Sequence, residues 1–227
     1  MTTRVYLTPE DIEQLEKAAT CIRDRLLIRV LFWAGCRVSE ALGVNVEDID
    51  TERGIITIKH LKARTRLLCP YCGTRMSRTA RFCPGCGKEV PKPIQRQQEA
   101  YRQRMIALDD ETLKLLTSFI NQDHTKGLIF KICRNHAWKI VKDCAERAGL
   151  GKMVNPETGE VRGVSPHRLR DAFAVMAIQV DDSTDAVRML QEQLGHASIA
   201  TTMRYRKIAG KEQRDWYDKL QKEVSHG

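Results

Sequence analysis

Two short cysteine motifs constrain the fold of this chain more than any other feature of its sequence. Cys69-Pro-Tyr-Cys72-Gly and Cys83-Pro-Gly-Cys86-Gly are two copies of one Cys-x-x-Cys-Gly device, ten residues apart. Each turn directs two thiolates at one point, so together they supply the four sulfur ligands that suit tetrahedral Zn²⁺. In so short a stretch, a bound metal has to replace a hydrophobic core. We therefore predict a structural zinc ribbon over residues 67–94.

The clustered cysteines also allow two other uses. A redox dithiol needs one Cys-x-x-Cys pair rather than two matched pairs, and an iron–sulfur site is the remaining alternative. Structural zinc is favoured, and four sulfur ligands leave no open position for catalysis. The other cysteines lie within apolar stretches and are expected to be small buried residues: Cys21, Cys36, Cys133 and Cys144.

Basic residues are concentrated in the same part of the chain. The sequence has 38 Lys and Arg against 29 Asp and Glu, but residues 59–104 alone contain twelve basic and two acidic residues. Such a segment is either a surface that binds a polyanion or a solvated basic face. A DNA-facing role is favoured by five cations on and beside the cysteine motifs, with a merely stabilising insert as the alternative: Arg75, Arg78, Arg81, Lys88 and Lys92.

Hydropathy excludes two classes of protein. No uncharged apolar run approaches the about 20 residues that a membrane span needs, and the first residues lack the apolar stretch of a signal peptide. Because the first residues do not resemble a signal peptide, the eight cysteines are not expected to form a disulfide scaffold. We expect a cytoplasmic protein with no membrane partner.

The spacing of apolar residues predicts an α+β fold that is mainly helical. Thr8-Pro-Glu-Asp is typical of a helix start, and apolar residues recur at helical spacing from Ile22 until Gly35. Runs at 54–59 and 105–108 predict a small antiparallel sheet, with the cysteine motifs where its hairpin turn would otherwise be. Further helices are expected at 39–42, 110–121, 134–148, 166–180, 184–194 and 211–223, with loops at 122–128 and 150–165.

Three short stretches carry residues suited to binding a phosphate. The first places Arg37 just after a helix-ending glycine; the second, Ser165-Pro-His-Arg-Leu-Arg170, starts a helix where anions bind readily; the third runs from Leu194-Gly-His196 to Tyr205. Each residue alone is more simply a surface charge, a polar loop residue or an ordinary half-buried ring. Their occurrence together in a basic chain favours a functional site.

These stretches are similar to the catalytic domain of the tyrosine recombinases, the phage integrase or Xer-like family. The family's Gly-x-Arg-x-Ser-Glu segment is matched at Arg37, its His-x-x-Arg box at His167 and Arg170, and its Leu-Gly-His segment at His196. Its nucleophile follows a Thr-Thr pair, as Tyr205 does, nine residues after the histidine. The family's hairpin lysine is best matched by Lys62, with Lys59 as a weaker candidate.

The resemblance implies a site-specific recombinase that cleaves and rejoins double-stranded DNA through a 3′-phosphotyrosine. Tyr205 is then the nucleophile, the two arginines clamp the scissile phosphate, and His196 donates a hydrogen bond to it. His167 orients the phosphate or accepts the tyrosine proton, Lys62 protonates the leaving 5′ oxygen, and Glu40 holds an arginine. No Mg²⁺ or ATP is required, because phosphoryl transfer here depends on positioning and charge stabilisation.

Two rivals and one organisational question stay open. A topoisomerase of type IB uses nearly the same residues, and a non-catalytic zinc-ribbon regulator needs only the basic face. We expect the catalytic fold over residues 1–66 and 95–227, with no N-terminal core-binding domain. Either the chain is then a fragment, or the ribbon partly takes over the DNA-clamping role of that domain. The family also implies self-association on DNA in a tetrameric synapse, in which the expected helix at 211–223 docks on a neighbour or on its own core.

Overall fold

A computed structural model describes residues 5–77, 79–122, 125–154, 158–209, 217 and 221, with side chains described except at 60–66, 96–102 and 207–209. The chain divides into two compact units. Unit 1 comprises Met1–Ile58 and Arg104–Gly227, and unit 2 comprises Lys59–Gln103. The inserted unit is therefore longer than the predicted ribbon of 67–94. No helix in the described ranges is long and apolar enough to cross a membrane.

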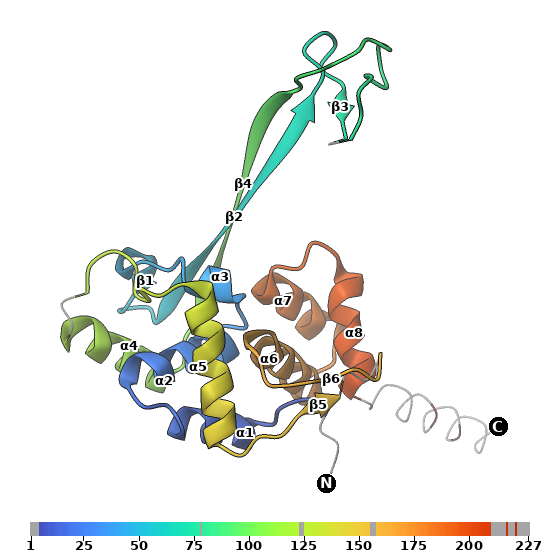
Figure 1. Ribbon diagram of the computed structural model, residues 1–227. Coiled ribbons are helices and arrows are strands. Elements are labelled where there is room, and N and C mark those ends of the chain that lie inside the picture. Colours follow the sequence, from blue (N-terminus) through green and yellow to red (C-terminus); the bar gives the residue numbers. More distant parts are fainter. Residues whose placement is uncertain are drawn as a thin grey trace. The chain divides into compact units, whose positions relative to one another are not determined.

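Unit 1 is built mainly from helices (Figure 1). They are α1 (Pro9–Lys17), α2 (Ile22–Trp33), α3 (Val38–Ala41), α4 (Asp110–Gln122), α5 (Arg134–Arg147), α6 (Pro166–Val180), α7 (Thr184–Leu194) and α8 (Ile199–Ala209). A short 3-10 helix, Val46–Asp48, follows α3. The predicted start of α1 is confirmed, because Thr8 and Asp11 form a reciprocal capping box.

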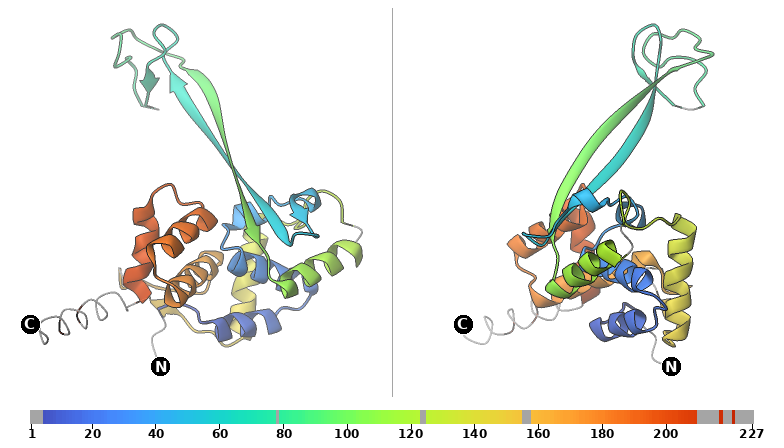
Figure 2. Two further views of the ribbon diagram at one scale, coloured as in Figure 1. Left: turned by 180° about the vertical axis from the view of Figure 1, so that it is seen from behind. Right: turned by 90° about the vertical axis from the view of Figure 1, so that its left-hand side faces the viewer.

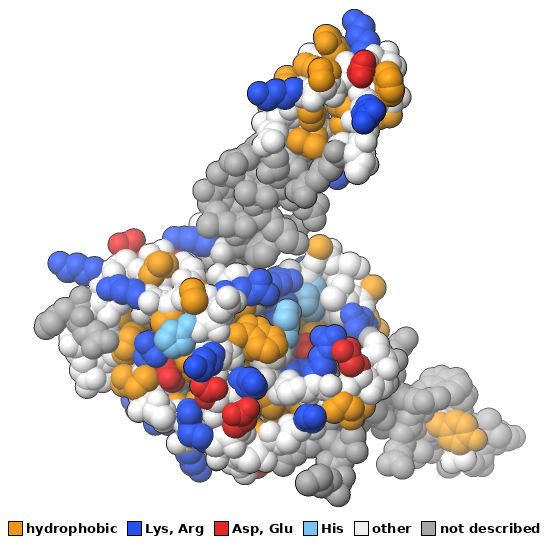
Figure 3. Space-filling model, in the orientation of Figure 1, with side chains coloured by type: hydrophobic (Ala, Val, Ile, Leu, Met, Phe, Trp, Pro, Cys, Tyr) orange, Lys and Arg blue, Asp and Glu red, His pale blue; other side chains and the backbone are white. Residues whose placement is uncertain are grey.

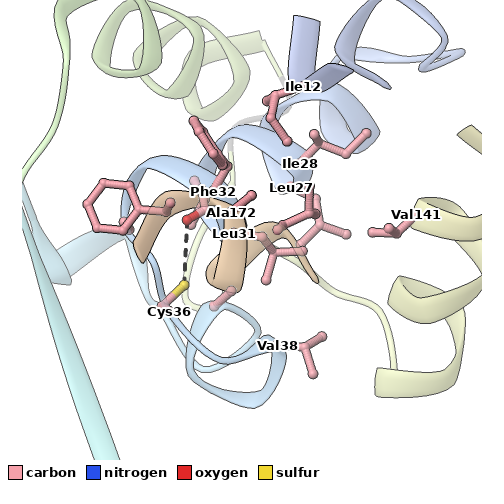
Figure 4. Close-up of a cluster of buried hydrophobic side chains, with 14 of the residues drawn as sticks. Ile12, Leu27, Ile28, Leu31, Phe32, Cys36, Val38, Val141 and Ala172 are labelled. Carbon is pink, nitrogen blue, oxygen red and sulfur yellow. Dashed lines mark hydrogen bonds between the residues drawn. The ribbon is translucent and has the colours of Figure 1, made fainter. Parts of the chain in front are cut away.

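Helix α2 is central to the core of unit 1. It packs against α1, α4 and α6, and its side chains Leu26, Leu27, Ile28, Val30, Leu31 and Phe32 are all buried. Figure 4 shows this cluster together with Cys36, whose thiol donates to the carbonyl oxygen of Val30. Because α1, α4 and α6 pack around α2, the end of this helix is held in place. The corner that follows it, which bears Arg37, is therefore positioned by the core.

Arg29, which lies among the apolar side chains of α2, is also buried. Arg29 donates to Glu16 on α1, to Asp109 before α4 and to Thr112 on α4. Burial of a cation is tolerated only where it is paired in this way. The network joins the first three long helices around one guanidinium.

Strands β2 (Ile55–Leu68) and β4 (Ile94–Ala107) pair with each other. Each strand belongs partly to unit 1 and partly to unit 2, and both are longer than the predicted 54–59 and 105–108. In unit 1, β1 (Ile49–Asp50) pairs antiparallel with the start of β2. In unit 2, β3 (Arg75–Met76) pairs antiparallel with the end of β2. Figure 2 gives two further views of these elements.

Several local expectations require correction. The segment 150–165 contains a small hairpin of β5 (Met153–Val154) and β6 (Val161–Arg162) rather than only loop, and α8 was not predicted. Cys21 and Cys133 are exposed, because they precede the first turns of α2 and α5, whereas Cys36 and Cys144 are buried as expected. The expected helix at 211–223 lies almost wholly outside the described residues.

Candidate functional site

The corner between α2 and α3 presents Arg37. Gly35 ends α2 with a φ of 56°, and a Cβ there would lie 2.8 Å from the ring of Phe173, so the turn requires glycine. Two residues later, Nη1 of Arg37 donates to Oε1 of buried Glu40 over 2.9 Å, and its backbone N–H donates to Oε2. The carboxylate therefore orients a half-buried guanidinium, as expected for Glu40.

Helix α6 supplies His167 and Arg170 from its first turns. Ser165 occupies the predicted N-cap position, but its side chain accepts no capping hydrogen bond. Arg170 is buried; its Nη1 donates to the carbonyl oxygen of Gly35 and its Nη2 to that of Leu194, both over 2.6 Å. These described hydrogen bonds go to carbonyl oxygens rather than carboxylates, so the site keeps a buried positive charge that suits an anion.

The end of α7 and helix α8 bring His196 and Tyr205 together. Gly195 terminates α7 in the left-handed conformation, with a φ of 65°. Thr202, fully buried on α8, lies 2.9 Å from Nδ1 of His196. One turn further, the ring of Tyr205 stacks on that of His196 with centroids 6.2 Å apart and an interplanar angle of 13°. The nine-residue spacing thus places both rings side by side.

Asp171, which the sequence patterns did not single out, contacts the proposed nucleophile directly. The Tyr205 hydroxyl donates to Oδ1 of Asp171 over 2.9 Å. Oδ2 of the same carboxylate lies 3.5 Å from Nη1 of Arg168, one turn earlier on α6. Burial and the neighbouring carboxylate raise the pKa of Tyr205 well above its usual value.

Arg104, near the end of β4, is the second residue that sequence reasoning missed. Its Nη2 donates to Oε2 of Glu40 over 2.7 Å, and its Nε donates to the carbonyl oxygen of Gln193 over 2.6 Å. A Cβ at position 195 would lie 3.0 Å from Nη1 of Arg104, so glycine also leaves room for this side chain. Arg104 joins the Arg37 corner to the segment that carries His196.

The concentration of guanidinium groups governs protonation in this site. Partial burial, followed by the charges of Arg170, Arg37 and Arg104, lowers the pKa of His196 to about 4. The pKa of His167 is also lowered, chiefly by desolvation. Both rings are therefore neutral at pH 7 before an anion binds. Figure 3 shows histidine side chains beside Lys and Arg on one face of unit 1.

Unit 2 brings the four clustered cysteines together at its own small core. Their sulfur atoms all lie within 4.8 Å of one another. The Cys69–Cys86 and Cys72–Cys83 sulfurs are 3.7 and 3.4 Å apart. A tetrahedron with Zn–S bonds of about 2.3 Å has edges of about 3.8 Å, so the cluster fits a tetrahedral ion.

The two cysteine turns repeat each other's hydrogen bonds. The N–H groups of Cys69 and Cys83 donate to the carbonyls of Thr74 and Lys88, each over 2.9 Å. The residue two after each first cysteine donates its N–H to that cysteine's sulfur, Tyr71 over 3.4 Å and Gly85 over 3.3 Å. Such donors stabilise thiolates, which are the form that ligates a metal.

Comparison with known proteins relates this geometry to a family. The phage integrase family matches residues 5–83 and 89–212, which is most of the chain and includes all three motif stretches of unit 1. This chain belongs to the phage integrase family. The match is interrupted at 84–88, inside the second cysteine motif.

Relatives of this chain include tyrosine recombinases. The chain is 27% identical to the tyrosine recombinase XerA of Pyrococcus furiosus over 209 residues, covering 90% of this chain and 58% of the relative. It is 31% identical to XerD of Bifidobacterium longum over 211 residues, covering 89% and 58%. The chain thus spans somewhat more than half of the length of these relatives.

Solved structures of the phage integrase family show the same mixed helical fold with small antiparallel sheets. The XerA recombinase crystal structure aligns with a TM-score of 0.65 and 20% identity, over 97% of this chain and 65% of that one. The catalytic domain of bacteriophage HP1 integrase aligns with a TM-score of 0.54 and 17% identity, over 95% and 94%. The likeness to both extends over nearly the whole chain.

The side chain of the predicted hairpin lysine lies outside the described set. This residue, Lys62, lies on β2 in unit 2. Lys59, the weaker candidate, is exposed at the first position of unit 2. The assignment of the lysine stays a prediction.

Proposed function

We propose that this chain cleaves and rejoins double-stranded DNA as a site-specific recombinase, through a covalent 3′-phosphotyrosine intermediate at Tyr205. The observation that supports this most is the buried Arg170, whose described hydrogen bonds go to carbonyl oxygens and which lies beside Arg37 and the His196–Tyr205 ring stack. A tyrosine nucleophile next to a buried guanidinium whose described hydrogen bonds go to carbonyl oxygens suits attack on a phosphodiester, where charge develops on the phosphate oxygens.

Each residue then has one task. Arg37 and Arg170 bind the scissile phosphate, and His196 donates to it from Nε2. Because Nδ1 of His196 can accept from Thr202, the ring proton is placed on Nε2, the nitrogen that has to donate. His167 orients the phosphate, and Lys62 protonates the leaving 5′ oxygen. No step in this scheme uses Mg²⁺ or ATP.

The test is covalent capture. Nicked duplex fragments, including candidate attachment sequences of the host element, are mixed with the chain, denatured in SDS and resolved for a protein–DNA adduct. We expect an adduct that Tyr205→Phe abolishes while its DNA affinity stays within about twofold of the parent, because only the nucleophilic oxygen is lost. Tight binding without an adduct on any substrate would support a DNA-binding regulator instead. Relaxation of any supercoiled plasmid without site preference would support a type IB topoisomerase.

The cysteine cluster of unit 2 is proposed to hold one structural Zn²⁺. The sulfur separations and the paired N–H donors fit this ion, and the small core of Met76, Val90 and the two buried cysteines is too limited to order the unit alone. Elemental analysis should find one zinc per chain. Cys69→Ser with Cys83→Ser should lose it, whereas Cys144→Ser should not.

Unit 2 is also proposed to contact DNA. Its described cations Arg75, Arg81, Lys88 and Lys92 are exposed, and Tyr71 and Phe82 are each 60% exposed. Figure 3 shows hydrophobic and basic side chains next to each other on this unit. Nζ of Lys88 lies 4.9 Å from the ring centroid of Tyr71. Exposed rings among cations are typical of surfaces that contact nucleic acid.

This second role has its own experiment. Arg75→Met with Lys92→Met should reduce the salt dependence of DNA binding by about two phosphate contacts. Tyr71→Ala with Phe82→Ala should weaken binding without changing that dependence. Ile94→Ala, an exposed apolar residue of the same unit, is the control. Unchanged affinity in all variants would show that unit 2 does not contact DNA.

The partners and organisation implied by the family are also proposals. We expect self-association into a tetramer only on DNA that carries two target sites. Residues 67–94 are proposed as a ribbon inserted into the catalytic fold of 1–66 and 95–227. Crosslinking with and without paired sites tests the assembly.

A further inference from the structure

The hydroxyl of Tyr205 already has a proton acceptor in this structure. Asp171, which follows Arg170 on α6, accepts the hydrogen bond from that hydroxyl over 2.9 Å. A general base has to lie within about 2.6–3.2 Å of the group whose proton it takes, and this carboxylate meets that condition. His167, the residue that the family resemblance offers for this task, has no hydrogen bond to Tyr205 among the described contacts.

We propose that Asp171 is the catalytic base that accepts the Tyr205 proton during cleavage and returns it during rejoining. This role rests on the proposed phosphotyrosine function and adds a residue to it. His167 is then left with orienting the phosphate.

The proton and bond changes balance without any further reactant. In cleavage, the Tyr205 O–H bond breaks and its proton passes to Oδ1 of Asp171 while the new O–P bond forms. The bond between phosphorus and the 5′ oxygen breaks, and that oxygen takes a proton from the general acid, assigned above to Lys62. In rejoining, the 5′ hydroxyl attacks phosphorus and gives its proton back to the general acid, the O–P bond to Tyr205 breaks, and protonated Asp171 returns its proton to the departing tyrosine oxygen.

The surroundings of the carboxylate suit a reversible acceptor. Arg168 on the same helix holds the other carboxylate oxygen at 3.5 Å, which fixes the orientation of Oδ1 toward the hydroxyl. Before DNA binds, burial and the negative charge of Asp171 keep Tyr205 protonated, as the direction of its pKa shift indicates. The nucleophile is therefore neutral until the phosphate is in place and O–P bond formation makes the proton labile.

The experiment compares three substitutions in the full chain, using single-turnover adduct formation on the nicked duplex. Asp171→Asn keeps an oxygen that can accept from the hydroxyl but cannot take its proton. Its cleavage rate should fall by about 100-fold or more, with DNA affinity within about twofold of the parent. Asp171→Glu, which keeps a carboxylate, should recover part of the rate. The matched control is Asp182→Asn, another arginine-paired aspartate, which holds Arg206 at 3.2 Å and should cleave at the parental rate.

A measurement without DNA tests the contact itself. In chain labelled at the tyrosine Cζ carbon, the pKa of Tyr205 should be lower in Asp171→Asn than in the parent, because a neutral amide replaces the carboxylate. The Asp182→Asn control should leave it unchanged.

The outcomes separate this role from the function on which it rests. A cleavage rate of Asp171→Asn within about threefold of the parent would overturn the role alone, and a faster rate would show that the carboxylate restrains the nucleophile instead. Equal Tyr205 pKa values in both proteins would overturn the contact. A parental chain that forms no adduct on any substrate would overturn the recombinase function, and the role of Asp171 with it.

Discussion

Replacing Arg104 by Met would remove the guanidinium that joins Glu40 to the end of α7. The methionine side chain keeps the apolar stem, so the change removes mainly charge and hydrogen bonds. Glu40 is buried, with 2% of its side chain exposed, and would lose the donor 2.7 Å from its Oε2 while keeping its hydrogen bonds with Arg37. The carbonyl oxygen of Gln193 would lose the donor 2.6 Å away.

Two lines of reasoning give a similar magnitude for the stability that Arg104→Met would lose. Removing one partner of a buried ion pair costs about 3–5 kcal/mol, with the lower end appropriate where a second cation remains. Independently, although desolvation raises the pKa of Glu40, Arg104 and to a smaller extent Arg37 outweigh it and lower that pKa from 4.5 to about 2, so the ionised carboxylate contributes roughly 3 kcal/mol of stability at neutral pH. For a chain of this size, about 3 kcal/mol corresponds to a drop in Tm of about 6–12 °C.

Thermal unfolding followed by circular dichroism at several pH values is the assay. The difference between parent and Arg104→Met should be largest at pH 7 and should narrow as pH falls from about 4.5 toward 2. In that range Glu40 is protonated in the unfolded chain before it is protonated in the folded parent. The parent therefore loses the stability that its ionised Glu40 provides, and the difference from the variant becomes smaller.

Two further variants complete this test. Met105→Gln, on the neighbouring, largely exposed position, should leave Tm within about 2 °C. Adding Glu40→Gln to Arg104→Met should restore part of the loss, because the buried carboxylate that lost one of its two arginines is then replaced by a neutral amide. A Tm change below about 2 °C for Arg104→Met, or one independent of pH, would refute the assigned pairing.

Three more expectations follow from the site. Thr202→Val should reduce the cleavage rate by about tenfold with DNA affinity unchanged, because Nδ1 of His196 loses the hydroxyl that sets its tautomer; an unchanged rate would remove Thr202 from the site. Gly195→Ala should lower the free energy of unfolding by at least about 1 kcal/mol, since position 195 has a φ of 65° and its Cβ would approach Arg104; denaturant titration measures this. The pKa of His196 is about 4, below its ordinary 6.5, so the unfolded chain binds this proton first and stability falls as pH drops from 6.5 to 4. His196→Gln should flatten that part of the profile, and an identical profile would contradict the assignment.

The three motif stretches of the candidate site could be found from the sequence because each is local. Arg37, His167 with Arg170, and His196 with Tyr205 occupy short segments with distinctive spacing, and the structure brings these segments together through the packing of α6 against α2 and α8. The first helix was equally accessible, because its capping box lies within four residues.

The residues that were missed depend on long-range contacts. Arg104 and Glu40 are 64 positions apart, so along the sequence Arg104 is only one more member of a basic segment. Asp171 contacts a tyrosine 34 positions away, and nothing near it marks this contact. Helix α8 has no apolar stripe, and much of β2 and β4 is polar with few large apolar residues, so neither the helix nor the strand length was deduced.

The alternation of side chains along β4 has a consequence for how this protein tolerates changes in length. Gln103 and Met105 are exposed, whereas Arg104 and Ile106 turn inward, and Arg104 is the first residue of unit 1 after the insert. Adding or deleting one residue within the paired part of β4 would exchange the two faces of the strand and bring Gln103 or Met105 to Glu40. A gain or loss of two residues would keep the two faces of the strand as they are. It would keep Arg104 opposite Glu40 only if the change lay elsewhere in the strand. The inserted unit can therefore vary in its loops, but its returning strand can change length only in steps of two.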